Sequence, residues 1–411
     1  MFPCSSVTGA VVVGPDVIYR VPALDPLYHY PSVSHTSSAP FKSPNPAHIP
    51  RNSKRDLIWP ISQQVVEHTA EAGYAAYIVS KPTLPLKVTF TRIATASGDS
   101  SERSLARSNH TVTVIGNKAY IFGGTTGNDV LSSNEVHVVT LQHSGKPEMD
   151  YSMIPALPTS EDGPTPTARS DHAACAFHGN IVVYGGSDEN DSLIDENSSL
   201  WLFSPERKTW DLLHSSKGDV GTGDIGPGPR RKAQLFAFEK HVLLFGGIDG
   251  SGDNASDLWQ FDIAARYWTQ LPTAPVATSN ATLANGQLWL ISGSDPMSSQ
   301  LHHISISSAS EERKWESFTF PTNPLVPGPR ARHDGALLPV TTGWGRNYLV
   351  YLLGYRDELS PELEEEGGKL HPGPRALFGA DVMDSGSSVV FWGGVNANGD
   401  RVGDGWVAKF E

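Results

Sequence analysis

The sequence predicts an all-β fold, a six-bladed β-propeller in which short sheets surround a central axis. Glycine (39), proline (31) and tryptophan (10) are abundant in the 411 residues, whereas charged residues make up only 18%. This composition is typical of short strands joined by tight turns. One pattern also recurs six times, in clear or weaker form: a turn arginine, a short strand, an apolar strand ending in Gly-Gly, a polar loop and aromatic-rich strands. A single four-stranded sheet cannot bury both faces, so radial stacking of these units is favoured.

Each copy of the pattern predicts up to four strands. The copies cover residues 107–124, 169–186, 231–271, 278–293, 330–354 and 375–394. A glycine pair suits the bend where the second strand enters a loop, because glycine adopts positive φ without steric cost. Trp210, Trp268 and Trp315 stand at matching places in the fourth strands. We expect these bulky rings to fill the wedges between blades.

The two ends of the propeller are predicted to meet. The sixth copy supplies three strands before Glu411, and LKVTFTRIATA (86–96) alternates like a fourth strand. We expect this N-terminal strand to close the last blade, with residues 85–411 as the propeller and residues 1–84 as a partly disordered extension rich in proline and serine.

The fifth blade is predicted to be incomplete. The strand YLVYLLG (348–354) and the strand RALFGADVM (375–383) are separated by a mainly acidic stretch with no aromatic residue after Tyr355. Two arrangements are possible. An N-terminal segment pairs with the bare edge, either AVVVGPDVIYRV (10–21) or GYAAYIVS (73–80), or the ring contains one thin blade.

Charge and cysteine content exclude several classes of partner. The formal charge is -13, and an acidic surface repels phosphate backbones, so we expect no nucleic acid. No run of 18 apolar residues is present, so we expect no membrane span. The two cysteines, Cys4 and Cys175, fit neither a disulfide scaffold nor a metal-ligand spacing. With no recognisable signal peptide, these features favour a reducing, cytoplasmic location.

The glycine pairs, the downstream tryptophans and the arginine turns resemble the Kelch-repeat family of β-propellers. The pairs stand at 123–124, 185–186, 246–247 and 393–394. The resemblance covers roughly 85–411 and implies the fold more than the function. SLARSNH, VYLLGYRD and the tail VVFWGGVNANGDRVGDGWVAKF are similar to small stand-alone fungal Kelch proteins. Some of those act in secondary metabolism, including cofactor-free cyclases that catalyse hetero-Diels–Alder reactions.

The turns before the innermost strands are predicted to surround the mouth of the central channel, where propellers commonly bind ligands. The predicted catalytic residues are Arg107, His110, Arg169, His172 and His333. The predicted substrate-binding residues are Tyr355, Arg356, Phe378, Trp392, Arg230, Arg330 and Arg375. Arginine forks bind carboxylates or enolates and neutral histidine shuttles protons, although both residue types also fix turn geometry.

Two functions remain open from the sequence. The first is a small-molecule site, in its sharpest form a cofactor-free cyclase acting on a polyketide–terpenoid type of substrate. The second is a scaffold or adaptor that binds a protein or peptide at the same mouth. Neither a cofactor nor a metal is expected: Cys175 lies inside the strand HAACAF, and His302 and His303 are adjacent on a strand and point to opposite faces.

Overall fold

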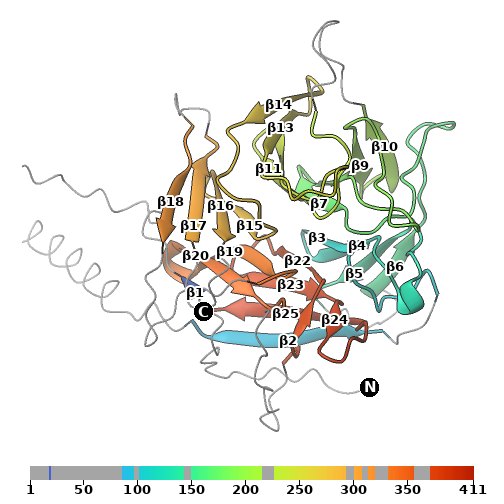
Figure 1. The fold of residues 1–411 in the computed structure, drawn as a ribbon. Helices are drawn as coiled ribbons and strands as arrows, with labels where there is room; N and C mark the ends of the chain where they lie inside the picture. Colours follow the sequence, from blue (N-terminus) through green and yellow to red (C-terminus); the bar gives the residue numbers. More distant parts are fainter. Residues whose placement is uncertain are drawn as a thin grey trace, which may run out of the picture.

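The chain forms an all-β propeller. The computed structural model describes residues 18–19, 86–96, 101–142, 150–214, 226–292, 300–307, 313–319, 332–355 and 371–411. Figure 1 shows the sheets of this part of the chain arranged around a central axis. Besides strands, the described residues form two short 3-10 turns, Gly127–Asp129 and Gly343–Gly345. None of the helices found among them has the length and apolar character needed to cross a membrane.

Four sheets are each built from four consecutive antiparallel strands. The first two contain β3 (Thr111–Ile115), β4 (Lys118–Phe122), β5 (Val136–Thr140), β6 (Tyr151–Ile154), β7 (Ala173–Phe177), β8 (Asn180–Tyr184), β9 (Leu200–Ser204) and β10 (Thr209–Leu213). The next two contain β11 (Gln234–Phe238), β12 (His241–Phe245), β13 (Leu258–Asp262), β14 (Tyr267–Leu271), β15 (Ala281–Ala284), β16 (Gln287–Ser292), β17 (Gln300–Ser305) and β18 (Glu316–Thr319). The first strand of each sheet lies innermost, so these strands face the axis.

A further sheet combines strands from both ends of the propeller sequence. It contains β22 (Gly379–Val382), β23 (Ser388–Trp392), β25 (Asp404–Phe410) and β2 (Val88–Thr95). The strand β2 pairs antiparallel with β25, with Val88 opposite Phe410 and a register shift between Arg92 and Ala94. Figure 1 shows this early strand lying beside the last strand of the chain. Beside this sheet, β21 (Arg375–Ala376) pairs with β24 (Val395–Asn396).

The remaining sheet contains β19 (Ala336–Thr342), β20 (Arg346–Leu352) and the two-residue strand β1 (Ile18–Tyr19). In β1, Ile18 lies opposite Val350 and Tyr19 opposite Leu349. This strand falls within AVVVGPDVIYRV, one of the two segments predicted to reach the bare edge. The other segment, GYAAYIVS, and the acidic run after Tyr355 lie outside the described residues.

Apolar clusters fill the spaces between neighbouring sheets. The innermost strands contact one another in the order β3, β7, β11, β15, β19, β22, and β22 contacts β3. Trp210, only 1% exposed, packs on Phe122 of the neighbouring sheet with ring centroids 5.0 Å apart. Trp268 packs on Tyr184 in the same way, 5.8 Å between centroids. The wedge-filling role predicted for these two tryptophans is confirmed, and Trp315 is partly buried against the cluster between the next two sheets.

Glycines at four matching positions connect one sheet to the turn of the next. Gly185 has φ +63°, and the amide of Gly186 donates to the carbonyl of Arg230 at 3.0 Å. A Cβ on Gly185 would lie 2.3 Å from that carbonyl oxygen. The same amide-to-arginine contact recurs from Gly124 to Arg169, from Gly354 to Arg375 and from Gly394 to Arg107. Glycine is therefore needed both for the backbone conformation and for the close approach of the next turn.

Candidate functional site

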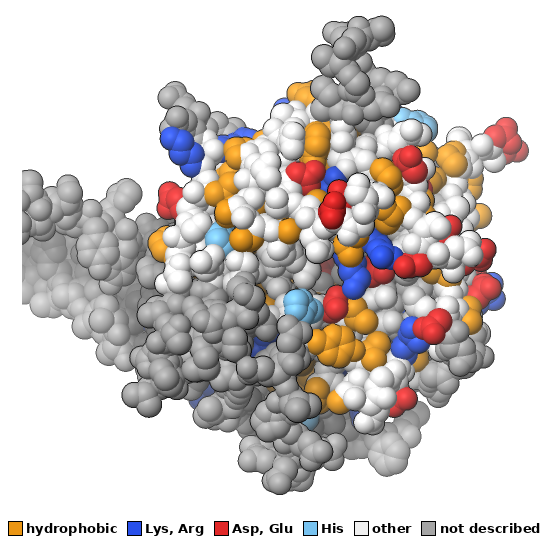
Figure 2. Space-filling model, viewed as in Figure 1, with side chains coloured by type: hydrophobic (Ala, Val, Ile, Leu, Met, Phe, Trp, Pro, Cys, Tyr) orange, Lys and Arg blue, Asp and Glu red, His pale blue; other side chains and the backbone are white. Residues whose placement is uncertain are grey.

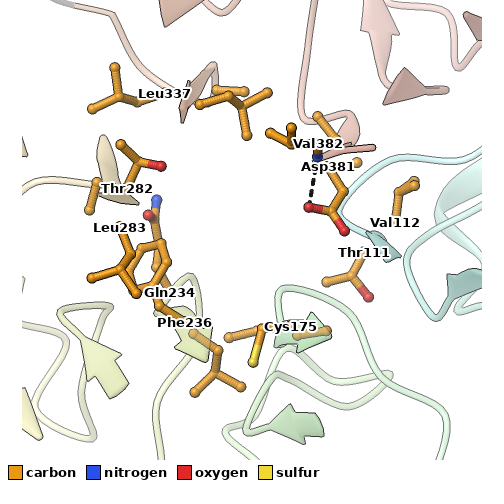
Figure 3. A pocket seen from close by; sticks show the side chains of 18 of the residues that line it. Thr111, Val112, Cys175, Gln234, Phe236, Thr282, Leu283, Leu337, Asp381 and Val382 are labelled. Carbon is orange, nitrogen blue, oxygen red and sulfur yellow. Dashed lines mark hydrogen bonds between the residues drawn. The ribbon is translucent and has the colours of Figure 1, made fainter. Parts of the chain in front are cut away.

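A cavity of about 470 Å³ lies on the axis, lined by the innermost strands β3, β7, β11, β15, β19 and β22. Figure 3 shows its side chains around an open centre. Most are apolar, including Phe236, Leu283, Leu337 and Val382. Polar groups are few: Thr111, His110, His172, Gln234, Thr282 and Asp381. Apolar walls with a few polar groups, at this volume, are typical of small-molecule sites. We call this cavity the channel.

Five turn residues around the mouth of the channel are linked by hydrogen bonds. They are Asn109, Asp171, Lys232, Asp334 and Leu377, and their φ angles lie between 53° and 57°. The amide of Asp171 donates to the carbonyl of Asn109 at 3.0 Å, and that of Lys232 donates to Asp171 at 2.7 Å. Leu377 donates to Asp334 at 3.1 Å, and Asn109 donates to Leu377 at 3.0 Å. These bonds between sheets fix the shape of the mouth.

The mouth also carries charge. Lys232 Nζ lies 3.1 Å from Asp334 Oδ1. Burial raises the pKa of Asp171, and the nearby cations Lys232 and Arg231 oppose that shift. Figure 2 shows basic and acidic side chains next to one another near the middle of one face of the molecule. A bound partner would therefore meet both signs of charge before reaching the apolar channel.

His110 and His172 line the channel, and each is only 5% exposed. His172 Nε2 lies 2.8 Å from Thr111 Oγ1. Its Nδ1 has no hydrogen-bond partner within the described part of the chain, and His110 makes no well-aligned hydrogen bond there, although the backbone of Trp392 lies close enough to favour its protonated form. Burial, and to a smaller extent the positive charge of Arg107, lowers the pKa of His110 to about 3. Burial and the charge of Arg169 hold the pKa of His172 well below its usual value. Both rings are neutral at pH 7, and their nitrogens without a partner are enclosed by protein atoms.

We expect His110→Phe to weaken the pH dependence of stability. Because the pKa of His110 is about 3 in the folded protein and 6.5 in a free side chain, only the unfolded chain binds this proton between those values. Stability is therefore lost as the pH falls below about 6.5, by up to about 1.4 kcal/mol per pH unit for one such group. Urea unfolding at pH 6 and pH 5 measures the difference. Equal losses in wild type and variant would contradict the expectation.

The turn arginines are placed away from the channel lining. Arg107 and Arg169 are both 0% exposed. Arg107 donates to the carbonyls of Ser104 and Gly123 at 2.6–3.0 Å and to Ser132 Oγ at 2.7 Å. Arg169 donates to the Gly185 carbonyl at 2.9 Å and to both carboxylate oxygens of Glu196, at 3.1 and 2.7 Å. These forks clamp their own loops, and their contact with a ligand remains a prediction.

The same clamp recurs in two other sheets. Arg230 donates to the Gly246 carbonyl at 3.0 Å and to Asp257 at 2.8 Å. Arg375 donates to the Gly393 carbonyl at 3.2 Å and to Asp404 at 2.7 Å. In both, the paired carboxylate also accepts from an indole: Trp259 donates to Asp257 and Trp406 donates to Asp404. The substrate-binding role predicted for these arginines likewise competes with these internal partners, although Nε of each is buried without a partner among the described residues.

In the fifth copy Arg332 takes the clamp position. Its Nη1 donates to the Leu353 carbonyl at 2.9 Å, and its guanidinium stacks over Tyr351. Arg330 lies outside the described residues. The residue three places after Arg332 is Gly335, so Gly335 lines the channel where His110 and His172 do in their copies.

The other predicted residues do not come together in a single site. Phe378 lines the channel beside His110. His333 exchanges backbone hydrogen bonds with Tyr355, at 2.8 and 3.0 Å, and Tyr355 is 43% exposed. Trp392 is 1% exposed and its indole donates to the Leu105 carbonyl at 2.9 Å, so it packs inside the fold. Arg356 lies outside the described residues.

Asp381 is a channel residue that the sequence motifs do not single out. It stands in the middle of the apolar strand FGADVM, six residues after Arg375. The residues six places after Arg169 and Arg230 are Cys175 and Phe236. Counting from each turn arginine would reveal a carboxylate at a level where other copies have Thr113, Cys175, Phe236 or Leu338. Across the described ranges, no three His, Cys, Asp or Glu side chains are grouped as a metal site would require.

Comparisons with known proteins agree with the fold. The chain is 28% identical to Kelch domain-containing protein 3 of Rattus norvegicus over 144 residues, 34% of each chain. It is 24% identical to Acyl-CoA-binding domain-containing protein 4 of Arabidopsis thaliana over 267 residues, 62% of this chain and 36% of that protein. It is 29% identical to Rho GTPase-activating protein gacHH of Dictyostelium discoideum over 161 residues, 38% of this chain and 9% of that protein. It thus spans about a third or less of these relatives.

One solved structure and one family profile also match. The solved structure of YjhT has a TM-score of 0.49 and 13% identity, covering 74% of this chain and 97% of that one. Residues 106–340, more than half of the chain, match the profile of the KLHDC2/KLHL20/DRC7 Kelch-repeats domain. Together with the repeated arginine turns and glycine pairs, this match shows that the chain belongs to the Kelch-repeat family.

Proposed function

We propose that the channel binds a small organic molecule and that this binding is the basis of the protein's function. The observation that carries the proposal is the cavity of about 470 Å³ at the axis, which joins apolar walls to a few polar groups. Asp381, Gln234 and Thr282 provide hydrogen-bonding groups on opposite walls. A site of this kind binds an apolar body by burial and orients it through the polar groups.

The rigidity of such a site would come from ring closure. The proposed ring has six blades, in which β1, β19 and β20 make the fifth and β2 is the outer strand of the last. The cyclic order of contacts among the innermost strands and the pairing of β2 with β25 support it. A closed ring fixes the width of the channel, so a ligand would meet a preorganised site.

For the reaction we propose a cofactor-free cyclisation of the hetero-Diels–Alder type. Burial raises the pKa of the Cys175 thiol, so this channel residue is a poor nucleophile at neutral pH. For His110 and His172 to hydrogen-bond a substrate carbonyl, their neutral rings would have to turn toward the channel, since the nitrogens without a partner are enclosed by protein atoms. Holding two reacting groups together can contribute roughly 7–11 kcal/mol to the lowering of a barrier, and a positioned donor stabilises developing charge.

A second candidate is the binding of a protein or peptide at the mouth. The ion pair of Lys232 with Asp334, next to the buried Asp171, favours it, because mixed charges around an apolar opening suit a peptide of complementary charge. In this case the partner would rest on the turn residues and leave the channel walls untouched.

Filling the channel should separate the two candidates. Leu283 projects from β15 into the channel, and we expect Leu283→Trp to abolish thermal stabilisation by polyketide and terpene fragments that stabilise the wild type. The matched control is Leu157→Trp, since Leu157 is 50% exposed and no part of the channel lining. The measurement is thermal-shift screening of the three proteins with the same fragments.

The control should behave as the wild type does. Fragments that stabilise wild type and Leu283→Trp equally would place binding elsewhere and contradict the proposal. Recovery of a stoichiometric protein partner that depends on Lys232, with no fragment bound, would favour the second candidate. Formation of the cyclised product above the protein-free rate, from a quinone-methide precursor and a terpene, would test the reaction itself.

A further inference from the structure

Asp381 is the one acidic side chain among the residues that line the channel. Its Oδ2 accepts from the Val114 amide at 2.7 Å, and its Oδ1 accepts from the Val382 amide at 2.8 Å. A carboxylate oxygen can accept more than one hydrogen bond, so both oxygens retain capacity for a ligand. Figure 3 shows the carboxylate extending into the open centre, across from Thr282 and Gln234.

No cation faces this carboxylate within the described part of the chain. The channel lining contains neither lysine nor arginine, and none of the ion pairs among the described residues includes Asp381. The two channel histidines are held neutral, as described above. The charged neighbour that affects Asp381 most is another acid, Asp384. A partly buried carboxylate without a counter-charge loses part of its hydration, and a cation from outside would offset that loss.

The walls around Asp381 are apolar. Cys175 and Phe236 stand at the same position of their strands, and Leu338 stands six residues after Arg332 on β19, the strand next to β22. With Leu283 they offer a surface for a hydrocarbon or aromatic body in the same cavity as a single negative charge. A carboxylate beside an apolar surface suits an amphiphilic amine, because such a ligand joins a cation to an apolar body.

We propose that the channel ligand is an amphiphilic amine, whose protonated nitrogen binds Asp381 while its apolar body packs against Phe236, Leu283 and Leu338. The proposal rests on the proposed small-molecule function of the same channel and adds the chemical class of the ligand. The formal charge of -13 supports it, because the field of an acidic protein attracts cations.

The pH dependence of binding follows from the same carboxyl group. Burial raises the pKa of Asp381 to about 6, against the two amide hydrogen bonds that favour the charged form. Below this pKa the carboxyl is protonated and loses its attraction for an ammonium group. Affinity for an amine should therefore be constant above pH 7 and fall about tenfold at one unit below the pKa, whereas affinity for a neutral ligand should not follow this curve.

The test uses a pair of probes that differ in charge, tryptamine and its hydroxyl analogue tryptophol. Affinities are measured by calorimetry for the wild type, Asp381→Asn and the control Asp384→Asn, since Asp384 is an exposed acid close in sequence and absent from the lining. We expect Asp381→Asn to weaken tryptamine about 10–100-fold, the range of a charge-assisted hydrogen bond. Tryptophol should change about threefold at most, and Asp384→Asn should resemble the wild type.

Each other outcome is decisive. If tryptophol binds as tightly as tryptamine to the wild type, or both weaken equally in Asp381→Asn, the amine proposal is overturned while the small-molecule function stands. If neither probe binds any of the proteins, the amine proposal is overturned, and the fragment screen then decides the proposed function separately. Should Asp381→Asn fail to fold, measurements on the wild type test the proposal. Its affinity for tryptamine relative to tryptophol must then fall when the pH is lowered from 7.5 to 5.

Discussion

Replacing Arg169 with alanine lowers the melting temperature by about 6–20 °C. The guanidinium is fully buried and holds both carboxylate oxygens of Glu196 and the carbonyl of Gly185. Without it, Glu196 keeps only the indole of Trp201 as a strong donor. Removing one partner of a buried ion pair costs about 3–5 kcal/mol, and each kcal/mol shifts the melting temperature of a large domain by roughly 2–4 °C.

The matched control is Arg103→Ala. Arg103 also makes a two-pronged contact with a carboxylate, Glu135, at 2.8 Å for both bonds, but its side chain is 64% exposed. Exposed pairs of this kind contribute at most about 1 kcal/mol. Both arginines make the same type of contact but differ in burial, so the melting temperatures of the two variants, measured by differential scanning calorimetry, show the effect of burial. A similar, small shift in both would show that the Arg169 clamp does not hold the sheet together.

Gly185→Ala is expected to destabilise the fold by about 2–5 kcal/mol. Gly185 has φ +63°, which costs an alanine about 1–2 kcal/mol. The added methyl would also lie 2.3 Å from the carbonyl oxygen of Arg230 in the next sheet. Relieving that overlap must move one turn away from its neighbour, at a further cost of roughly 1–3 kcal/mol.

Gly179→Ala provides the comparison for this second effect. Gly179 has φ +77°, and an added methyl there would meet nothing within 4 Å, so this position carries the conformational cost alone. The free energy of unfolding, measured with guanidinium chloride, should therefore fall further for Gly185→Ala than for Gly179→Ala by roughly 1–3 kcal/mol. Equal losses would mean that the contact between sheets is loose enough to absorb a methyl group.

The strands and the glycine bends could be predicted from the sequence because both depend on local properties. Alternating β-branched and aromatic residues indicate the strands, and paired glycines mark positions that need positive φ. Trp210 and Trp268 could be assigned to the wedges because bulky aromatic side chains at matching repeat positions have few other places to be buried.

The fifth copy shows where local patterns fail. It contains two candidate arginines, Arg330 and Arg332, and Leu353 stands where other copies have their first glycine. Leu353 adopts φ +55°, so a glycine-like conformation is imposed on leucine by the turn around it. Without the glycine pair the repeat can be aligned two residues out of register, which matches His333 to His110 in place of Gly335. The hydrogen bond from Arg332 to Leu353, together with that from Gly354 to Arg375, fixes the alignment.

The sequence pattern predicts the turn arginines as site residues for a related physical reason. A sequence shows that an arginine recurs but not where its long side chain goes, and here the side chains of Arg107 and Arg169 turn back into their own loops. Asp381 could not be predicted as a site residue because a single acid in a strand has no motif. Asp381 is a candidate site residue because no counter-charge lies near it among the described residues. The packing of the innermost strands is needed to show this.

The most direct test of the small-molecule account is a crystal structure of the protein with a fragment that stabilises the wild type but not Leu283→Trp. The account predicts electron density for the fragment inside the channel, between Asp381 and the wall formed by Gln234, Thr282 and Leu283. Density on the turn residues of the mouth or on the outer strands, with the channel filled only by solvent, would contradict it.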